Sequence, residues 1–172
     1  MKTQVWAHRG ASAYAPENTL EAFKLAAGQG ADGVELDVQL SRDNELVVAH
    51  DETIDRVSNG SGYIKDHTLS ELKKLRFNRL FPEYRDASIP TLGEVYELLR
   101  PTGLVVNVEL KTGIVPYEGI EERVLDLASE MGMGDRVIYS SFHHPSLVKL
   151  KMLDPSVKTG LLYSDGWIDV AS

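Results

Sequence analysis

Cysteine is absent from all 172 residues of the chain. Disulfide bonds, thiolate nucleophiles, and zinc or iron-sulfur sites with cysteine ligands are therefore excluded. Long hydrophobic runs are also missing, and the first residues lead directly into a strand-like segment without the apolar stretch of a signal peptide. We therefore expect a cytoplasmic protein with no stable membrane insertion.

Positive charge is in the minority. The chain has 18 lysines and arginines against 26 aspartates and glutamates, which gives a formal net charge of -8. This balance opposes the phosphate backbone of nucleic acids, so we expect no nucleic-acid partner. A bound cation and a few basic side chains can still reverse the field inside one cleft. The charge balance therefore leaves small phosphate esters open as substrates.

Short apolar runs alternate with segments of helical periodicity, a pattern typical of βα units around a parallel sheet. Extended segments are predicted at residues 5–7, 33–40, 45–50, 104–110, 136–142 and 159–163. Helices are predicted at residues 18–28, with Asn18 as the cap, at 91–99, 120–131 and 145–153, together with a short helix from residue 69. A threonine followed three residues later by a glutamate, at residues 68–71 and 91–94, has capping-box spacing and marks the start of two of these helices. No clear element is predicted for residues 165–172.

This alternation amounts to about five βα units, which we interpret as one domain over residues 1–172. Residues 52–90 break the rhythm and are rich in Gly, Ser, Asn and charge, which indicates a small insertion after the second strand region. A closed eightfold barrel takes roughly 250 residues. We therefore expect an α/β fold, a TIM-type (β/α) barrel that is C-terminally incomplete. An open parallel sheet with helices on both faces is the alternative.

Acidic side chains share one face of two predicted strands. Glu35 and Asp37 alternate with apolar residues in the segment 33–40, and Glu109 does so in 104–110. Because active sites of (β/α) barrels lie at the carboxyl ends of the strands, these three carboxylates are expected to meet. Oxygen ligands without cysteine favour Ca²⁺ or Mg²⁺ over zinc. The simpler interpretation is that each acid pairs with a lysine or arginine.

Two histidines follow predicted strands at the same edge, His8 after residues 5–7 and His50 at the end of residues 45–50. Cleavage of a phosphodiester requires a base for the attacking oxygen and an acid for the departing alkoxide, and imidazole titrates near neutral pH. Arg9 and Lys111 lie where they would contact phosphate oxygens. Structural roles for the histidines, and ion pairs for Arg9 and Lys111, are the plainer alternatives.

The motifs taken together resemble the bacterial glycerophosphodiester phosphodiesterase family. The segments that carry the resemblance are His8-Arg9-Gly10, Pro16-Glu17-Asn18-Thr19, Gly33-Val34-Glu35-Leu36-Asp37-Val38, His50-Asp51 and Val108-Glu109-Leu110-Lys111. The resemblance implies a phospholipase-C-like TIM barrel that hydrolyses glycerophosphodiesters to an alcohol and sn-glycerol 3-phosphate. It also implies that His8 and His50 are the acid-base pair. By the same resemblance, Glu35, Asp37 and Glu109 bind the cation, and Arg9 and Lys111 contact the substrate.

The sequence departs from this family at its end, where the last three βα units and an aromatic-containing strand motif are absent. Three other functions therefore stay open. A related barrel phospholipase would need a membrane-docking surface, which the acidic balance opposes. A non-catalytic binding or regulatory domain is the second, since an unclosed barrel exposes strand edges. Another metal-dependent barrel enzyme would use the carboxylates to polarise a carbonyl group. Formation of a homo-oligomer also stays open.

Overall fold

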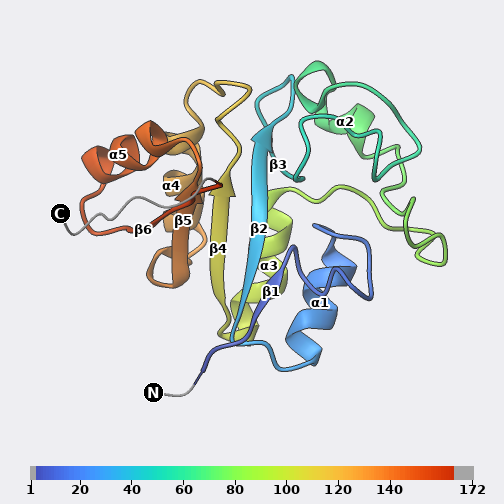
Figure 1. Ribbon diagram of the computed structural model, residues 1–172, viewed down its shortest axis with the longest axis horizontal. Helices are drawn as coiled ribbons and strands as arrows, with labels where there is room; N and C mark the ends of the chain where they lie inside the picture. Colours follow the sequence, from blue (N-terminus) through green and yellow to red (C-terminus); the bar gives the residue numbers. More distant parts are fainter. Residues whose placement is uncertain (1–2, 165–172) are drawn as a thin grey trace.

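The computed structural model describes residues 3–164, and its strands form one mainly parallel sheet. The parallel strands, in spatial order, are β1 (Trp6–His8), β2 (Gly33–Leu40), β4 (Val105–Leu110), β5 (Val137–Ser141) and β6 (Lys158–Leu161) (Figure 1). The short strand β3 (Leu46–Val48) pairs antiparallel with the second half of β2, beyond the point where β1 ends. The predicted extended segments therefore correspond to strands, whereas residues 165–172 lie outside the described part of the chain.

The helices connect these strands. They are α1 (Leu20–Gly28), α2 (Leu69–Leu72), α3 (Leu92–Leu99), α4 (Ile120–Glu130) and α5 (His144–Leu153), with short 3₁₀ turns η1 (Ile64–Asp66), η2 (Arg100–Thr102) and η3 (Gly134–Arg136). Both α2 and α3 begin with a capping box, in which a threonine and the glutamate three residues later satisfy each other's backbone N–H groups. The capping signals at residues 68–71 and 91–94 are confirmed.

The start of α1 differs from the prediction. Thr19, not Asn18, is the N-cap, and its hydroxyl accepts a hydrogen bond from the backbone N–H of Ala22. Asn18 instead adopts a left-handed backbone conformation with φ of 57°. Its side chain is turned into the molecule, where Nδ2 donates to Asp37 Oδ2 at 2.8 Å. The prediction of an Asn18 cap is wrong because this residue is committed to a buried carboxylate.

The main hydrophobic core lies between one face of the sheet and the helices α1, α3, α4 and α5. Alternate residues of β2, from Val34 to Leu40, pack in this core together with Phe23 of α1 and Leu99 of α3. In Figure 1, α3 accordingly lies behind β2. The opposite face of β2 carries polar side chains instead. Helices on a single face are the arrangement of a (β/α) barrel, so the alternative of a sheet covered on both faces is wrong.

Residues between β3 and α3 pack around a second, smaller core beyond the carboxyl end of β2 (Figure 1). Its buried members are Val47, Ala49, Ile54, Ile64, Leu72, Phe77 and Ile89. In β3, Val47 belongs to this smaller core and the next residue, Val48, to the main core. The strand therefore connects the two cores through its two faces. Within residues 3–164, we find no helix with the length and apolar character needed to span a membrane.

Candidate active site

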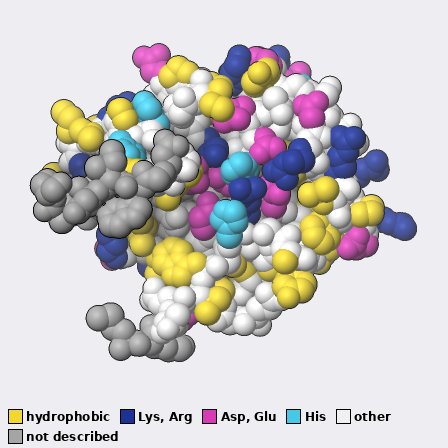
Figure 2. All heavy atoms as spheres, viewed as in Figure 1, with side chains coloured by type: hydrophobic (Ala, Val, Ile, Leu, Met, Phe, Trp, Pro, Cys, Tyr) yellow, Lys and Arg dark blue, Asp and Glu magenta, His cyan; other side chains and the backbone are white. Residues whose placement is uncertain are grey.

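The three acidic residues singled out in the sequence converge on the polar face of the sheet. Asp37 and Glu109 are paired neighbours on β2 and β4, and Glu35 is two residues before Asp37 on the same face. One carboxylate oxygen of each lies within 4.8 Å of the other two. Figure 2 shows acidic, basic and histidine side chains gathered near the centre of this face. Convergence follows from the parallel register of β2 and β4.

Two oxygens of this cluster, Glu35 Oε1 and Asp37 Oδ1, are buried and accept no hydrogen bond from the described residues. A buried carboxylate oxygen without a partner is costly. Burial, followed by the negative charges of Asp37 and Glu109, raises the pKa of Glu35 to about 8. Burial and the charge of Asp37 likewise raise the pKa of Glu109. This group of oxygen donors would hold a hard divalent cation, whose charge together with that of Lys111 would balance the three carboxylates.

Lys111 follows β4 and lies beside the acidic cluster. Its Nζ is 3.1 Å from Glu109 Oε1 and 3.9 Å from Asp37 Oδ1. One side of the cluster therefore already has a positive charge. The alternative prediction, that Lys111 forms an ion pair, is confirmed. Its ammonium group also lies at the border of the acidic cluster, where a phosphate contact was predicted.

Arg9 lies in the loop after β1 and contacts three acids through different atoms. Its backbone N–H donates to Glu35 Oε2 at 3.0 Å, and Nη1 donates to Glu17 Oε1 at 3.0 Å. Its Nε is buried, has no hydrogen bond to residues 3–164, and lies 3.7 Å from Asp37 Oδ2. The left-handed conformation of Arg9, with φ of 56°, is rare for a residue with a long side chain. Such outliers gather where the surrounding structure holds them for a function.

The two histidines stand at the same edge of the sheet but in different surroundings. His8 has a side chain that is 69% exposed, with Nε2 at 3.8 Å from Glu35 Oε2. His50 is less exposed, and its Nδ1 is 2.6 Å from Asp51 Oδ1. Gln39, on the polar face of β2, donates through Nε2 to the carbonyl oxygens of residues 49, 50 and 51. The loop that carries His50 is thereby fastened to the sheet.

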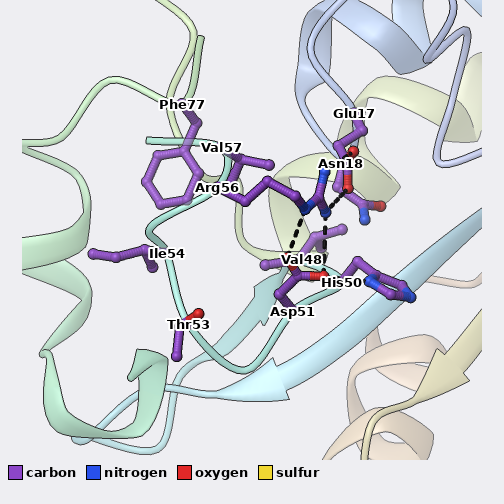
Figure 3. A pocket seen from close by; sticks show the side chains of 11 residues that line it. Glu17, Asn18, Val48, His50, Asp51, Thr53, Ile54, Arg56, Val57 and Phe77 are labelled. Atoms are coloured by element: carbon purple, nitrogen blue, oxygen red, sulfur yellow. Dashed lines mark hydrogen bonds and ion pairs between the residues drawn. The ribbon is translucent and has the colours of Figure 1, made fainter. Parts of the chain in front are cut away.

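Four polar residues for which the sequence predicted no role at the site also belong to this region: Glu17, Asn18, Asp51 and Arg56. Figure 3 shows Arg56 between Asp51 and Glu17, with its guanidinium group directed at both carboxylates. Glu17 and Asn18 belong to a motif that carried the family resemblance, but they lie in a loop where periodicity gives no direction. Arg56 lies in the segment interpreted as an insertion, so no sequence signal connected it with the site.

Comparison with known proteins identifies relatives over nearly the whole chain. The sequence pattern of the Glycerophosphoryl diester phosphodiesterase family matches residues 8–168. A glycerophosphodiester phosphodiesterase of Caldanaerobacter subterraneus subsp. tengcongensis is 52% identical over 170 residues, covering 98% of this chain and 70% of the relative. One of Bacillus altitudinis is 44% identical, covering 95% of this chain and 67% of the relative.

Solved structures agree with these relatives. The glycerophosphodiester phosphodiesterase of Agrobacterium tumefaciens superimposes with a TM-score of 0.84 at 36% identity, covering 92% of this chain and 66% of that chain. An Oleispira antarctica phosphodiesterase, solved with the product sn-glycerol-3-phosphate, gives 0.82 at 38% identity, covering 94% and 66%. The chain thus spans about two thirds of the length of these structures.

The fold and these likenesses define an enzyme of the phosphodiesterase class built on a TIM-type (β/α) barrel. The chain belongs to the glycerophosphoryl diester phosphodiesterase family. The predicted fold class and family are confirmed.

Proposed function

We propose that the protein hydrolyses glycerophosphodiesters to an alcohol and sn-glycerol 3-phosphate with the help of a divalent cation. The observation that carries this proposal is the convergence of Glu35, Asp37 and Glu109 beside two histidines at one edge of the sheet. Family membership supports the substrate class. The product bound to the Oleispira antarctica relative supports a glycerol phosphate as the group that is released.

The cation in this proposal is Ca²⁺ or Mg²⁺, held by Glu35, Asp37 and Glu109. The donor set consists of carboxylate oxygens, and two of them are buried and receive no hydrogen bond from the part of the chain that the structure describes. When bound, such a cation polarises a phosphate oxygen and neutralises the negative charge that develops on it. Arg9 Nε and Lys111 Nζ would add positive charge on the same side of the phosphate.

The two histidines would exchange protons with the substrate. Asp51 accepts a hydrogen bond from Nδ1 of His50, which leaves Nε2 of that ring to take up or release a proton. His8, the more exposed of the two, would exchange a proton with the other reacting oxygen of the substrate. One imidazole removes the proton of the attacking oxygen while the other protonates the departing alkoxide. The attacking oxygen is either that of water or that of the 2-hydroxyl group of the substrate's glycerol. A substrate without this hydroxyl group separates the two routes, because it still reacts if water attacks directly.

Release of glycerol 3-phosphate from glycerophosphocholine tests the proposal. We expect EDTA to abolish turnover, and His8→Ala, His50→Ala and Glu35→Gln each to lower kcat by about 10²–10⁴-fold. His67→Ala is the matched control, because His67 hydrogen-bonds the backbone of Ser61 in the smaller core region. Turnover that is insensitive to EDTA would contradict the role of the cation. Cation binding without any turnover would favour the non-catalytic binding alternative.

A further inference from the structure

We propose that Arg56 is a positioning residue of this active site, which fixes His50 through Asp51 and fixes Arg9 through Glu17. The inference rests on the proposed phosphodiesterase function, in which these two residues act on the substrate. Arg56 itself lies outside the acidic cluster, in the segment between β3 and α3. Its influence on the reaction would therefore pass entirely through its two carboxylate partners.

The guanidinium group of Arg56 binds two carboxylates at once. Toward Asp51 it donates from Nε to Oδ2 at 2.6 Å and from Nη2 to Oδ1 at 3.2 Å. Toward Glu17 it donates from Nη1 to Oε2 at 2.7 Å and from Nη2 to Oε1 at 2.8 Å. A guanidinium carries five N–H donors in a fixed plane. Four of them are thus used in two paired contacts, which sets the distance and angle between the carboxylates (Figure 3).

The contact with Asp51 decides which nitrogen of His50 carries a proton. The hydrogen bond from Arg56 holds the pKa of Asp51 at about 2, so this carboxylate is ionised and accepts hydrogen bonds only. Its Oδ1 is 2.6 Å from His50 Nδ1, which must therefore be the donor. Neutral His50 then has its free electron pair on Nε2. Without Arg56, Asp51 would be free to rotate, and this tautomer would lose its support.

The contact with Glu17 fixes the guanidinium group of Arg9. Burial alone would raise the pKa of Glu17, but the hydrogen bonds and charges of Arg56 and Arg9 outweigh it and hold this pKa below its usual value. Glu17 is therefore a carboxylate shared by two arginines, one of which lies beside the acidic cluster. Loss of Arg56 would leave Glu17 to Arg9 alone, and the orientation of Arg9 would change.

Lysine cannot replace Arg56 in this role. A lysine presents a point charge at the end of a flexible chain and makes no planar pair of contacts with either carboxylate. Arg56→Lys keeps the charge but loses the geometry, whereas Arg56→Ala loses both. Asp51→Asn breaks the arm toward His50, and Glu17→Gln weakens the arm toward Arg9. These four variants separate charge from geometry and one arm from the other.

Long-range ¹⁵N NMR of His50 in the substrate-free protein, together with steady-state kinetics, tests the proposal. We expect the Nδ1–H tautomer in the wild type and in Glu17→Gln, and a mixture of tautomers in Arg56→Ala, Arg56→Lys and Asp51→Asn. For Arg56→Ala we expect kcat to fall by about 10²-fold, with partial recovery in added guanidinium. Glu17→Gln should mainly raise KM, by about tenfold.

Arg42→Lys is the matched control, because Arg42, in the turn between β2 and β3, contacts both carboxylate oxygens of the exposed Glu71 through Nη2. It should change neither the His50 tautomer nor the kinetics. An unchanged tautomer in both Arg56 variants would overturn the proposal, as would equal losses in Arg42→Lys and Arg56→Lys. Since the tautomer is read without substrate, failure of the proposed hydrolysis would appear separately as a correct tautomer without turnover.

Discussion

Asn18 supports the acidic cluster from the side of the β1–α1 loop. It is 3% exposed, and its amide satisfies Asp37 Oδ2, whereas Asp37 Oδ1 accepts no hydrogen bond from any described residue. Hydrogen bonds of this kind fix the orientation of a carboxylate that binds a metal ion. The backbone of Asn18 is also left-handed, a conformation that asparagine and glycine tolerate better than other residues.

Substitutions at Asn18 can separate these two contributions. Asn18→Gly keeps the backbone conformation but removes the amide, so we expect about tenfold weaker binding of Ca²⁺ or Mg²⁺. It should also lower the free energy of unfolding by about 1–3 kcal/mol, because a buried oxygen of Asp37 loses its donor. Asn18→Ala should weaken cation binding equally and cost about 1 kcal/mol more in the free energy of unfolding. Calorimetric titration and urea unfolding measure the two quantities. Equal cation affinity in the wild type and both variants would contradict the role of the amide.

Asp51 gives a defined dependence of stability on pH. Its pKa in the folded protein is about 2, below the value of about 3.9 for an unfolded aspartate. A carboxylate with a lowered pKa stabilises the fold above the unfolded value, and that contribution is lost as the pH falls through the folded value. Because Asp51 is partly exposed, solvent screening limits its contribution at neutral pH to about 1 kcal/mol.

Comparison of the wild type with Asp51→Asn by urea unfolding checks this expectation. The difference in the free energy of unfolding should be constant from about pH 7 to pH 5, fall to about half near pH 3, and approach zero toward pH 2. A difference that stays the same at pH 7 and pH 3 would show that the Asp51 charge does not stabilise the fold.

At the scale of elements, the loop between β1 and α1 depends on a close backbone contact at Gly10. The residue has φ of 75°, and an added Cβ would lie 2.7 Å from the backbone carbon of Ala22 in α1. The loop therefore packs directly on the helix that follows it. Because Arg9 directly precedes Gly10 in the chain, this packing also holds Arg9 beside Glu35.

We expect Gly10→Ala to lower the free energy of unfolding by about 3 kcal/mol, because it combines a left-handed conformation with a steric clash. Gly30→Ala is the control: Gly30 has φ of 78°, but no atom of the described residues lies within 4 Å of the added Cβ. Its cost should be about 1 kcal/mol, the cost of the conformation alone. Similar losses for the two variants in urea unfolding would show that the contact with Ala22 adds nothing.

The elements were largely predictable from the sequence because each depends on a local pattern. Strict alternation marked β2, and the threonine-glutamate spacing marked the first residues of α2 and α3. The antiparallel direction of β3 was not predictable, because a short extended segment carries no information about its partner. The prediction of Asn18 as the cap of α1 was wrong because its side chain is held by Asp37, which is 19 residues further along the chain.

The acidic cluster was predictable for the same reason, since alternation and parallel register together place Glu35, Asp37 and Glu109 on one face. The contacts around Arg56 were not predictable from the sequence. They join loops that are 39 residues apart, and their geometry depends on how the smaller core packs. Side chains on loops have no periodicity from which a direction can be inferred, so these partners become visible only in three dimensions.

At the scale of the whole molecule, the two hydrophobic cores differ greatly in size. The larger one packs between the sheet and four helices, whereas the smaller one is enclosed mainly by loops and short helical turns. The prediction that residues 52–90 are an insertion in a single domain stays a prediction, and the separate core supports it. A small core surrounded by loops is expected to open at lower free energy than the sheet.

Hydrogen exchange followed by mass spectrometry checks this difference. Amides of β2 and β4 should show the highest protection, and amides of residues 52–90 should exchange through a lower-energy opening. Ile64→Ala, which truncates a fully buried side chain of the smaller core, should lower protection there by about 2–4 kcal/mol. Leu36→Ala in the main core should lower protection everywhere. Equal protection in both regions of the wild type would contradict two separate openings.

The alternation of β2 also determines where the family can gain or lose residues during evolution. Odd-numbered positions from Glu35 to Gln39 face the site, and the even-numbered positions from Val34 to Leu40 face the core. Insertion or deletion of one residue in this strand would exchange the two sets, placing carboxylates among the helices and aliphatic side chains in the site. Insertions and deletions should therefore be confined to loops. Within residues 52–90 they should be tolerated where the contacts of Arg56 with Asp51 and Glu17 are preserved.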